Sequence, residues 1–415
     1  MKKTEAKIYH FLRWSQKYTK TDMVYLAKGG FWFVLNQIVS VVGSLLLAIF
    51  FANLLPKETY GSYRYILSVA SILTISSLSG MHSAIIRTVA RGYEGSFIPA
   101  IKTRLKWSLL GSLGSFLLAG YYFINHNTTL TIAFLIVAVF MPFLNSLNLY
   151  TSLFNGRRQF KKQNVYLIIN NLFSVAVLIT ALFLTKNLFL IILAYFGSHS
   201  FIRFVLLQIA LRKTSLNKKQ DPNTIPYGKH LSLMGVIETI SNHLDKILVW
   251  HFLGAVQVAI YSFALILPQK IKGLLEIITP LALPKLSQKP KTELKLTLPK
   301  KIFKFFLVII PVVILYIIIA PFLYKIFFPE YLDSILYSQV LVLTLLYIPI
   351  TLFGTSLVAK MQTKKLYFLR TSLSLTRIIL LLILTPLFGL WGVISAVLVF
   401  QIIAFSLNLF LFKKM

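Results

Sequence analysis

An acidic and a basic residue stand side by side in a segment that is otherwise apolar enough to cross a bilayer. The pair is Asp245-Lys246, within the stretch from Glu238 to Gln269. A charge near the middle of a membrane is costly, so such residues usually face a polar cavity or an opposite charge. Successive residues of a helix point about 100° apart, so we predict that these two side chains do not pair with each other.

Other charged residues of the same half lie within apolar segments. Glu238 precedes Asp245 by seven residues, about two helical turns, and is expected on the same face. With Asp245 it forms either a cation or proton site, or it meets a base near the membrane interface. Lys270 and Arg377 lie deep within their segments, whereas Lys272 is close enough to an end for its side chain to reach the interface.

The first half carries a smaller set of polar residues within apolar segments. His199 precedes Arg203 by one turn, on the same face. The histidine either titrates near neutral pH or packs as a neutral residue between helices. Four asparagines either line a polar path or hydrogen-bond between helices, namely Asn145, Asn148, Asn170 and Asn171.

Composition fixes the class of protein that must position these residues. Of 415 residues, 57% are hydrophobic and 13% are charged. A soluble domain has about 45–50% hydrophobic and about 25% charged residues. The apolar runs, each about 20 residues long, predict transmembrane helices, so the fold class is an all-α integral membrane protein. Without cysteine the chain has no disulfide, zinc-thiolate or iron–sulfur ligand. No phosphate-cradling loop, metal-ligand cluster or nucleophile elbow is present, so we expect neither a cofactor nor an enzyme.

Twelve crossings account for the chain. Their approximate bounds are 30–53, 63–84, 107–124, 130–153, 165–184, 188–211, 230–252, 258–283, 305–327, 334–359, 371–387 and 390–412. Short turns separate some of them, among them Leu55 to Gly61 and Phe388-Gly389, and longer basic gaps separate others.

The basic residues set the orientation. Of 43 Lys and Arg, 34 lie in gaps on the N-terminal side, three lie in the opposite gaps and six lie within crossings. This bias predicts that both termini are cytoplasmic. The net charge of +32 therefore reflects membrane topology and not nucleic-acid binding.

The chain divides into two related halves. We expect a basic N-terminal segment over 1–28, either an amphipathic surface helix or a disordered tail. A lobe of helices 1–6 follows over 29–211, then a cytoplasmic linker over 212–229 and a lobe of helices 7–12 over 230–415. At a shift of 198 residues, 51–67 aligns with 249–265, so that Tyr63 meets Tyr261. Six crossings per half give the copies one orientation, which predicts parallel repeats with a cavity between the lobes.

At these turns the chain resembles the polysaccharide (O-antigen and capsule) flippase family of the multidrug/oligosaccharidyl-lipid/polysaccharide exporter superfamily. The resemblance lies in Ala52 to Tyr63, in Leu244 to Leu248 with Phe252 to Gly254 and Ile260 to Ser262, and in Asn155 to Arg157. By topology it extends over essentially the whole chain. The related lipid II flippases carry arginines early in the first helix and have fourteen helices. This chain has Asn36, Gln37, Ser40 and Ser44 there, which argues against that branch.

The resemblance implies two six-helix lobes, alternating access and export of an oligosaccharide linked to a polyprenyl (pyro)phosphate. Such a substrate needs a cationic, water-filled path through the membrane. We therefore expect the substrate-binding residues in a central cavity to be Lys246, Lys270, Arg377, Arg203, His199, Asn145 and Asn148. Asp245 and Glu238 are the candidates for coupling to an ion gradient. Lys246 could instead form a structural ion pair.

Two other functions compete with this interpretation. A small-molecule exporter of the same superfamily would favour acidic cavity residues, but the six bases within crossings outnumber three acids, Glu238, Asp245 and Glu276. A membrane glycan polymerase would need a sizeable outer loop, and the outer gaps here are short. We expect a multi-pass protein of the cytoplasmic membrane whose partners are the lipid-linked glycan and membrane lipids. Other polysaccharide-assembly proteins are further candidate partners, and nucleic acid is not.

Overall fold

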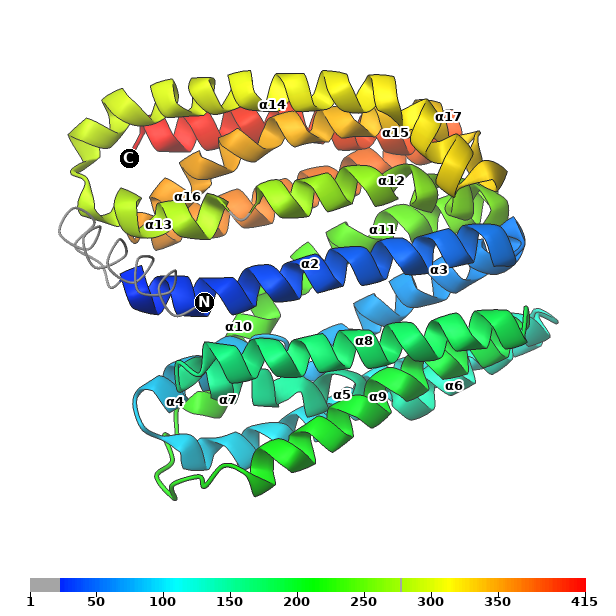
Figure 1. The fold of residues 1–415 in the computed structure, drawn as a ribbon, viewed down its shortest axis with the longest axis horizontal. Coiled ribbons are helices and arrows are strands. Elements are labelled where there is room, and N and C mark those ends of the chain that lie inside the picture. The colour runs from blue at the N-terminus through cyan, green and yellow to red at the C-terminus, as the bar shows by residue number, and fades with distance from the viewer. Residues whose placement is uncertain (1–22, 277) are drawn as a thin grey trace, which may run out of the picture. The chain divides into compact units, whose positions relative to one another are not determined.

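A computed structural model describes residues 23–276 and 278–415, which form an all-α fold (Figure 1). The helices up to residue 234 are α2 (Met23–Leu54), α3 (Lys57–Leu73), α4 (Met81–Ala90), α5 (Phe97–Ile124), α6 (Thr128–Ser146), α7 (Tyr150–Gly156), α8 (Phe160–Leu184), α9 (Leu188–Arg212) and α10 (Thr224–Met234). Those that follow are α11 (Val236–Leu253), α12 (Ala255–Leu275), α13 (Ile278–Gln288), α14 (Lys291–Phe327), α15 (Ser334–Leu341), α16 (Thr351–Ala359) and α17 (Thr363–Lys413). Short 3-10 helices join some of them, namely η1 (Thr74–Ser77), η2 (Glu94–Ser96), η3 (Leu147–Leu149), η4 (Pro329–Tyr331) and η5 (Val342–Ile350).

The helices have the length and apolarity of membrane spans. Within the described residues, nine are long and apolar enough to cross a membrane, and ten if the α3–α4 pair, bent by 45°, counts as one span. The prediction of an all-α, multi-pass membrane protein is therefore confirmed. The count of twelve crossings and the cytoplasmic position of both termini stay predictions.

Helix α17 is a hairpin. Gly389 breaks it at φ 59° and ψ −132°, a conformation that side chains disfavour. The Nζ atom of Lys365 donates to the carbonyl of Lys414 at 2.6 Å, so the two ends of the helix lie together. Figure 1 shows the chain doubling back from orange to red. The turn predicted at Phe388-Gly389 is thus present.

Two helices begin well before the crossings predicted for them. Helix α5 begins at Phe97, whereas the third crossing was predicted from residue 107, and α14 begins at Lys291, whereas the ninth was predicted from residue 305. The basic residues near these starts suggested polar gaps. In fact Phe97, Ala100, Ile101 and Arg104 form a buried stripe at helical spacing, so tertiary packing extends α5 by about three turns.

The chain forms two compact units. The first contains the described residues up to Leu47, Leu73–Thr185 and Phe189–Met234, and the second contains Ala48–Ile72, Lys186–Leu188 and Gly235–Met415. The predicted lobes at 29–211 and 230–415 and the linker at 212–229 stay predictions. The segment predicted at 1–28 falls largely outside the described residues.

In the first unit, small residues bring α5 against its neighbours. The hydroxyl of Ser115 donates to the carbonyl of Phe134 at 2.7 Å, and the hydroxyls of Ser108 and Ser146 lie 3.1 Å apart. Such contacts are common between membrane helices, where small polar residues allow close packing. They fix the register between α5 and α6.

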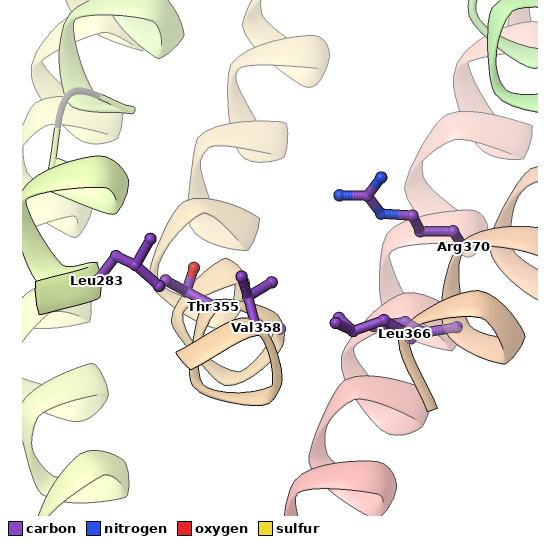
Figure 2. Close-up of a pocket in the computed structure, with 7 residues that line it drawn as sticks. Leu283, Thr355, Val358, Leu366 and Arg370 are labelled. Carbon is purple, nitrogen blue, oxygen red and sulfur yellow. The ribbon is translucent and has the colours of Figure 1, made fainter. Parts of the chain in front are cut away.

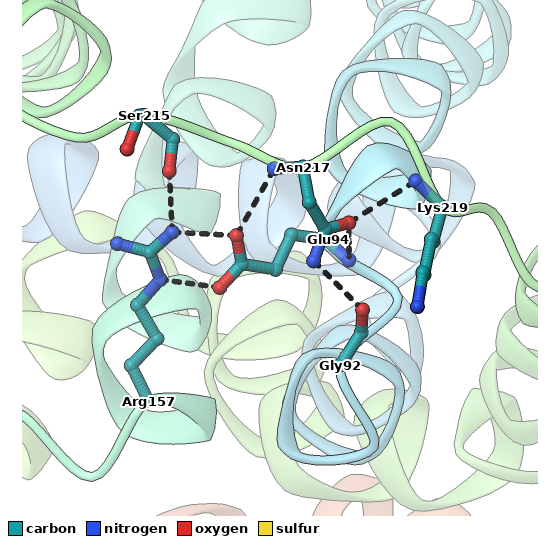
Figure 3. Close-up of polar contacts among 6 residues, drawn as sticks. All are labelled: Gly92, Glu94, Arg157, Ser215, Asn217 and Lys219. Carbon is teal, nitrogen blue, oxygen red and sulfur yellow. Dashed lines mark hydrogen bonds and ion pairs between the residues drawn. The ribbon is translucent and has the colours of Figure 1, made fainter.

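The segment after α9 folds back onto the first unit (Figure 3). The guanidinium of Arg157 donates to both carboxylate oxygens of Glu94, at 2.6 and 2.5 Å. The backbone N–H of Asn217 donates to the same carboxylate at 3.2 Å, and Arg157 also donates to the carbonyl of Ser215 at 2.6 Å. A bidentate pair of this kind is strong and directional, so it holds residues 215–219 against η2.

The second unit contains both copies of the repeated turn. The aligned segments 51–67 and 249–265 each form helix, turn and helix, as α2–α3 and α11–α12. A Cβ atom at Gly61 would lie 1.8 Å from the carbonyl oxygen of Ala255, so only glycine allows this approach. Rings of Tyr60 and Phe263 pack at 4.7 Å, and those of Tyr65 and Trp250 stack at 4.5 Å. The repeated turns therefore pack on each other.

Candidate functional site

The acid–base pair lies on α11, and both residues are buried. Asp245 is 2% exposed and Lys246 is 6% exposed. Helix α11 buries Ser241, Asp245, Leu248 and Val249 on one stripe, and Lys246 lies next to it. Because an unpaired charge at such a site is costly, the partners of these two groups decide what the site can do.

The carboxylate of Asp245 accepts hydrogen bonds from two elements. One oxygen accepts the backbone N–H of Lys246 at 2.8 Å and its Nζ atom at 3.5 Å. The other accepts the Tyr261 hydroxyl of α12 at 2.9 Å and lies 3.9 Å from Nη2 of Arg377 on α17. The carboxylate therefore bridges α11, α12 and α17.

The prediction that Asp245 and Lys246 do not pair was wrong. The 100° offset between neighbouring residues holds for their Cβ atoms. The lysine side chain is long, however, and its Nζ atom lies over the Tyr261 ring, 5.8 Å from the ring centre, and 3.5 Å from the carboxylate. The flexibility of the four-carbon side chain overrides the backbone geometry.

Arg377 joins the two arms of the α17 hairpin to α11. Its Nη1 atom donates to the Asn242 side-chain oxygen at 2.8 Å, and its guanidinium lies 5.9 Å from the ring centre of Phe400. Its Nε atom is buried and has no hydrogen-bond partner among the described residues. This donor therefore takes no part in holding the site together.

Two further cations enlarge the cluster. Arg64 of α3 interacts electrostatically with Lys246 and with Lys270, which is half-buried on α12. We call the set Arg64, Asp245, Lys246, Lys270 and Arg377 the α11 charge cluster. It holds four cations and a single carboxylate, so it favours an anionic ligand.

The structure does not bring Glu238 into this cluster. Its side chain is exposed in the first turn of α11, whereas Asp245 is buried two turns later. Lys272 instead forms an ion pair with Glu276, four residues on, at 3.6 Å, and both side chains are nearly half exposed. Exposed pairs of this kind contribute little to stability.

The remaining predicted residues lie in the first unit. Arg203 donates to the carbonyl of Leu144, and His199 Nδ1 lies 2.9 Å from the carbonyl of Tyr195. Asn145 donates to the hydroxyl of Ser77 at 3.4 Å, and Asn148 is partly buried. Lys246, Lys270, Arg377, Asp245 and Glu238, by contrast, all belong to the second unit.

Sequence reasoning missed three residues that matter here. Tyr261 and Asn242 hold the α11 charge cluster, and Arg104 is buried in the first unit. The alignment of Tyr63 with Tyr261 singled out this tyrosine but did not reveal its hydroxyl contact. For Arg104, the apolar stripe from Phe97 was the available signal.

A cavity of about 360 Å³ opens in the second unit, between α13, α16 and α17 (Figure 2). Its walls are largely apolar, and Arg370 contributes the one guanidinium in the lining. The lining residues are Leu283, Gly354, Thr355, Val358, Leu366, Leu369 and Arg370. Across the described part of the chain, no group of three His, Asp or Glu side chains could hold a metal ion.

Solved structures show which fold this is. The chain resembles lipid II flippase MurJ in an inward closed conformation, with a TM-score of 0.71 and 16% identity over 93% of this chain and 87% of that one. It also resembles a multidrug resistance MATE family transporter of the MOP superfamily in an inward-facing conformation, with a TM-score of 0.60 and 13% identity over 90% and 95% of the two chains. A third match is a MATE in complex with MaD5, with a TM-score of 0.65 and 12% identity over 94% and 95%.

At the sequence level, no curated protein matches the chain significantly. The sequence pattern of the family described as "Polysaccharide biosynthesis protein" matches residues 26–289, which is more than half of the chain. The solved structures therefore show that the chain has the fold of MOP-superfamily transporters and flippases. The match to the family pattern shows to which family the chain is related. This chain belongs to the polysaccharide biosynthesis protein family.

Proposed function

We propose that this protein is a flippase of the cytoplasmic membrane for lipid-linked glycans. It moves an oligosaccharide repeat unit, carried on a polyprenyl (pyro)phosphate, from the inner to the outer leaflet for surface polysaccharide synthesis. It works by alternating access through a cationic central cavity. The family relationship and the MOP-superfamily fold support transport. The observation that carries the substrate class is the excess of cations in the α11 charge cluster.

The α11 charge cluster has four positive charges and one negative charge. The net positive charge can attract a phosphate. Asp245 neutralises part of the charge and holds Lys246 and Arg377 in place through short contacts. The unpartnered Nε of Arg377 and the half-buried Lys270 offer donors to substrate oxygens. Arginine is well suited to bind phosphate because its donors form a rigid fork.

The sign of the net charge at a binding site determines which substrates it favours. A multidrug-type exporter is the second candidate, because MATE transporters share the fold. A net positive site would repel an organic cation, since like charges repel at short range. A glycan polymerase is less favoured, because the solved structures that share the fold of this chain are transporters and flippases.

Deletion of the gene in its host, followed by complementation, tests the proposal. Loss of the flippase should leave lipid-linked repeat units accumulated on the inner leaflet and remove surface polysaccharide. Wild-type protein and the Lys272→Ala variant, which alters an exposed ion pair, should restore export. Unchanged surface polysaccharide in the deletion strain would contradict the proposal. Sensitivity to cationic drugs with normal polysaccharide would favour the multidrug exporter instead.

A further inference from the structure

The first unit contains a second pair of cations, Arg104 and Arg203, beside a histidine. Arg104 on α5 is 1% exposed, Arg203 on α9 is partly buried, and His82 lies on α4. Electrostatic interactions join all three residues. Because the two guanidinium groups repel each other, holding them together in a buried place requires compensation.

The described part of the first unit does not supply a carboxylate to balance them. In the part of the first unit that the structure describes, the carboxylates belong to Glu94 and Asp221. Glu94 pairs with Arg157 at 2.5 Å, and Asp221 pairs with Arg91 at 3.3 Å. Both acids are thus occupied elsewhere. Among the described residues of this unit, no fixed anion therefore balances the charges of Arg104 and Arg203.

Neutral groups hold the cations in position. Nε of Arg104 donates to the carbonyl of Ser77 at 2.8 Å, and Nη1 of Arg203 donates to the carbonyl of Leu144. Asn145, next to Leu144, contacts the Ser77 hydroxyl, so the two anchoring points lie close together. Carbonyl dipoles orient a guanidinium but leave its unit charge intact.

Three donors have no hydrogen-bond partner among the described residues. They are Nη1 of Arg104, Nε of Arg203 and the hydroxyl of Tyr150, and all three atoms are buried. Tyr150 itself is 0% exposed and interacts electrostatically with Arg203. A guanidinium is a donor only, and the phenol can donate, so this set matches an anion.

We propose that the first unit binds a small monovalent inorganic anion of the halide class between Arg104, Arg203 and Tyr150, beside His82. The size follows from the enclosure, because Arg104 and Tyr150 are 1% and 0% exposed, whereas Lys270 and Arg377 of the α11 charge cluster are partly exposed. The class of ion follows from the donor set, since two cations and three unpartnered donors suit a single spherical anion, whereas the four oxygens of a phosphate accept more hydrogen bonds. The bound ion takes the place of the missing carboxylate.

The site lies at a break in the membrane helices. Ser77 ends η1, and the next residue, Leu78, has a positive φ of 54°. An anion bound to Arg104 therefore stabilises the break between η1 and α4 through the Ser77 carbonyl, and it ties this segment to α9 through Arg203.

A halide titration of the purified full-length protein tests the proposal. The protein is kept in detergent with sodium gluconate, and chloride or bromide replaces gluconate at constant ionic strength. We expect Tm to rise with halide concentration as for a ligand that binds the folded state. Crystals grown in bromide should show its anomalous signal beside Nη1 of Arg104. The absence of any halide effect would overturn the proposal, as would a response to inorganic phosphate alone.

Variants then locate the site. Tyr150→Phe keeps the ring and removes one donor, so the half-saturating chloride concentration should rise about tenfold. Arg203→Gln should abolish the halide response, whereas Arg212→Gln, at the exposed end of the same helix, should retain it. An unchanged response in both Tyr150→Phe and Arg203→Gln would refute this location. If Arg203→Gln does not fold, Tyr150→Phe and the wild-type titration still decide. No glycan is needed, so the result is independent of the proposed flippase activity.

Discussion

Replacing Asp245 by Asn tests how the α11 charge cluster is held together. The amide has nearly the same shape as the carboxylate, but it removes the one negative charge among the four cations. The oxygen that accepts the Lys246 N–H can be kept. The NH₂ group would then face the Tyr261 hydroxyl and the Arg377 guanidinium, and the guanidinium cannot accept a hydrogen bond.

The size of the effect follows from the distances. Lys246 Nζ and Arg377 Nη2 lie 3.5 and 3.9 Å from the carboxylate oxygens. At an effective dielectric constant of about 20, each contact contributes about 4–5 kcal/mol of Coulomb energy before desolvation is subtracted. Removing one partner of a buried ion pair typically costs about 3–5 kcal/mol. We expect Asp245→Asn to lower the free energy of unfolding by about this amount.

A double-mutant cycle makes the test specific. Unfolding would be followed in detergent by tryptophan fluorescence, since Trp250 stacks on Tyr65 in the same unit. Combining Asp245→Asn with Lys246→Met should cost less than the sum of the two changes, by at least about 1 kcal/mol. Exactly additive effects, or an Asp245→Asn variant as stable as the wild type, would refute the reasoning.

Three further changes probe the fold. Gly61→Ala places a Cβ atom against the Ala255 carbonyl and should destabilise the protein by about 1–3 kcal/mol, whereas Gly120→Ala, which meets nothing within 4 Å, should not; thermal unfolding compares them. Glu94→Gln weakens its bidentate pair and should speed proteolysis within residues 213–223, and an unchanged cleavage rate would argue against the clamp. Gly389→Ala puts a side chain at φ 59° and should lower stability by about 1–2 kcal/mol; equal stability would contradict the strained turn.

Hydrophobic patterning predicted the membrane helices well. Runs such as 130–153 and 188–211 correspond to the helical stretches 128–156 and 188–212, because a bilayer demands long apolar helices whatever their tertiary partners. The turn at Gly389 was also predictable, since an apolar run of that length must reverse. Helix starts were predicted less well. Arg104 suggested a polar gap, although the stripe from Phe97 buries it.

Side-chain contacts were the least predictable part of the site. Apolar context alone singled out Lys246, Lys270 and Arg377. Their connection through Asp245 depends on how α11, α12 and α17 pack and on a rotamer of Lys246, and helix periodicity specifies neither. In the same way, Glu238 was predicted on the same helix face as Asp245, but Glu238 is exposed and Asp245 is buried.

The central claim is that the cations of the α11 charge cluster carry a lipid-linked anion across the membrane. The most direct measurement uses purified protein in vesicles that contain a fluorescent polyprenyl pyrophosphate-linked oligosaccharide. A membrane-impermeant quencher reports its transfer between leaflets. We predict that Lys246→Met and Arg377→Gln each lower the transfer rate at least about tenfold, the effect of losing one charged hydrogen bond, while Lys272→Gln matches the wild type. Wild-type transfer rates in both Lys246→Met and Arg377→Gln would contradict the account.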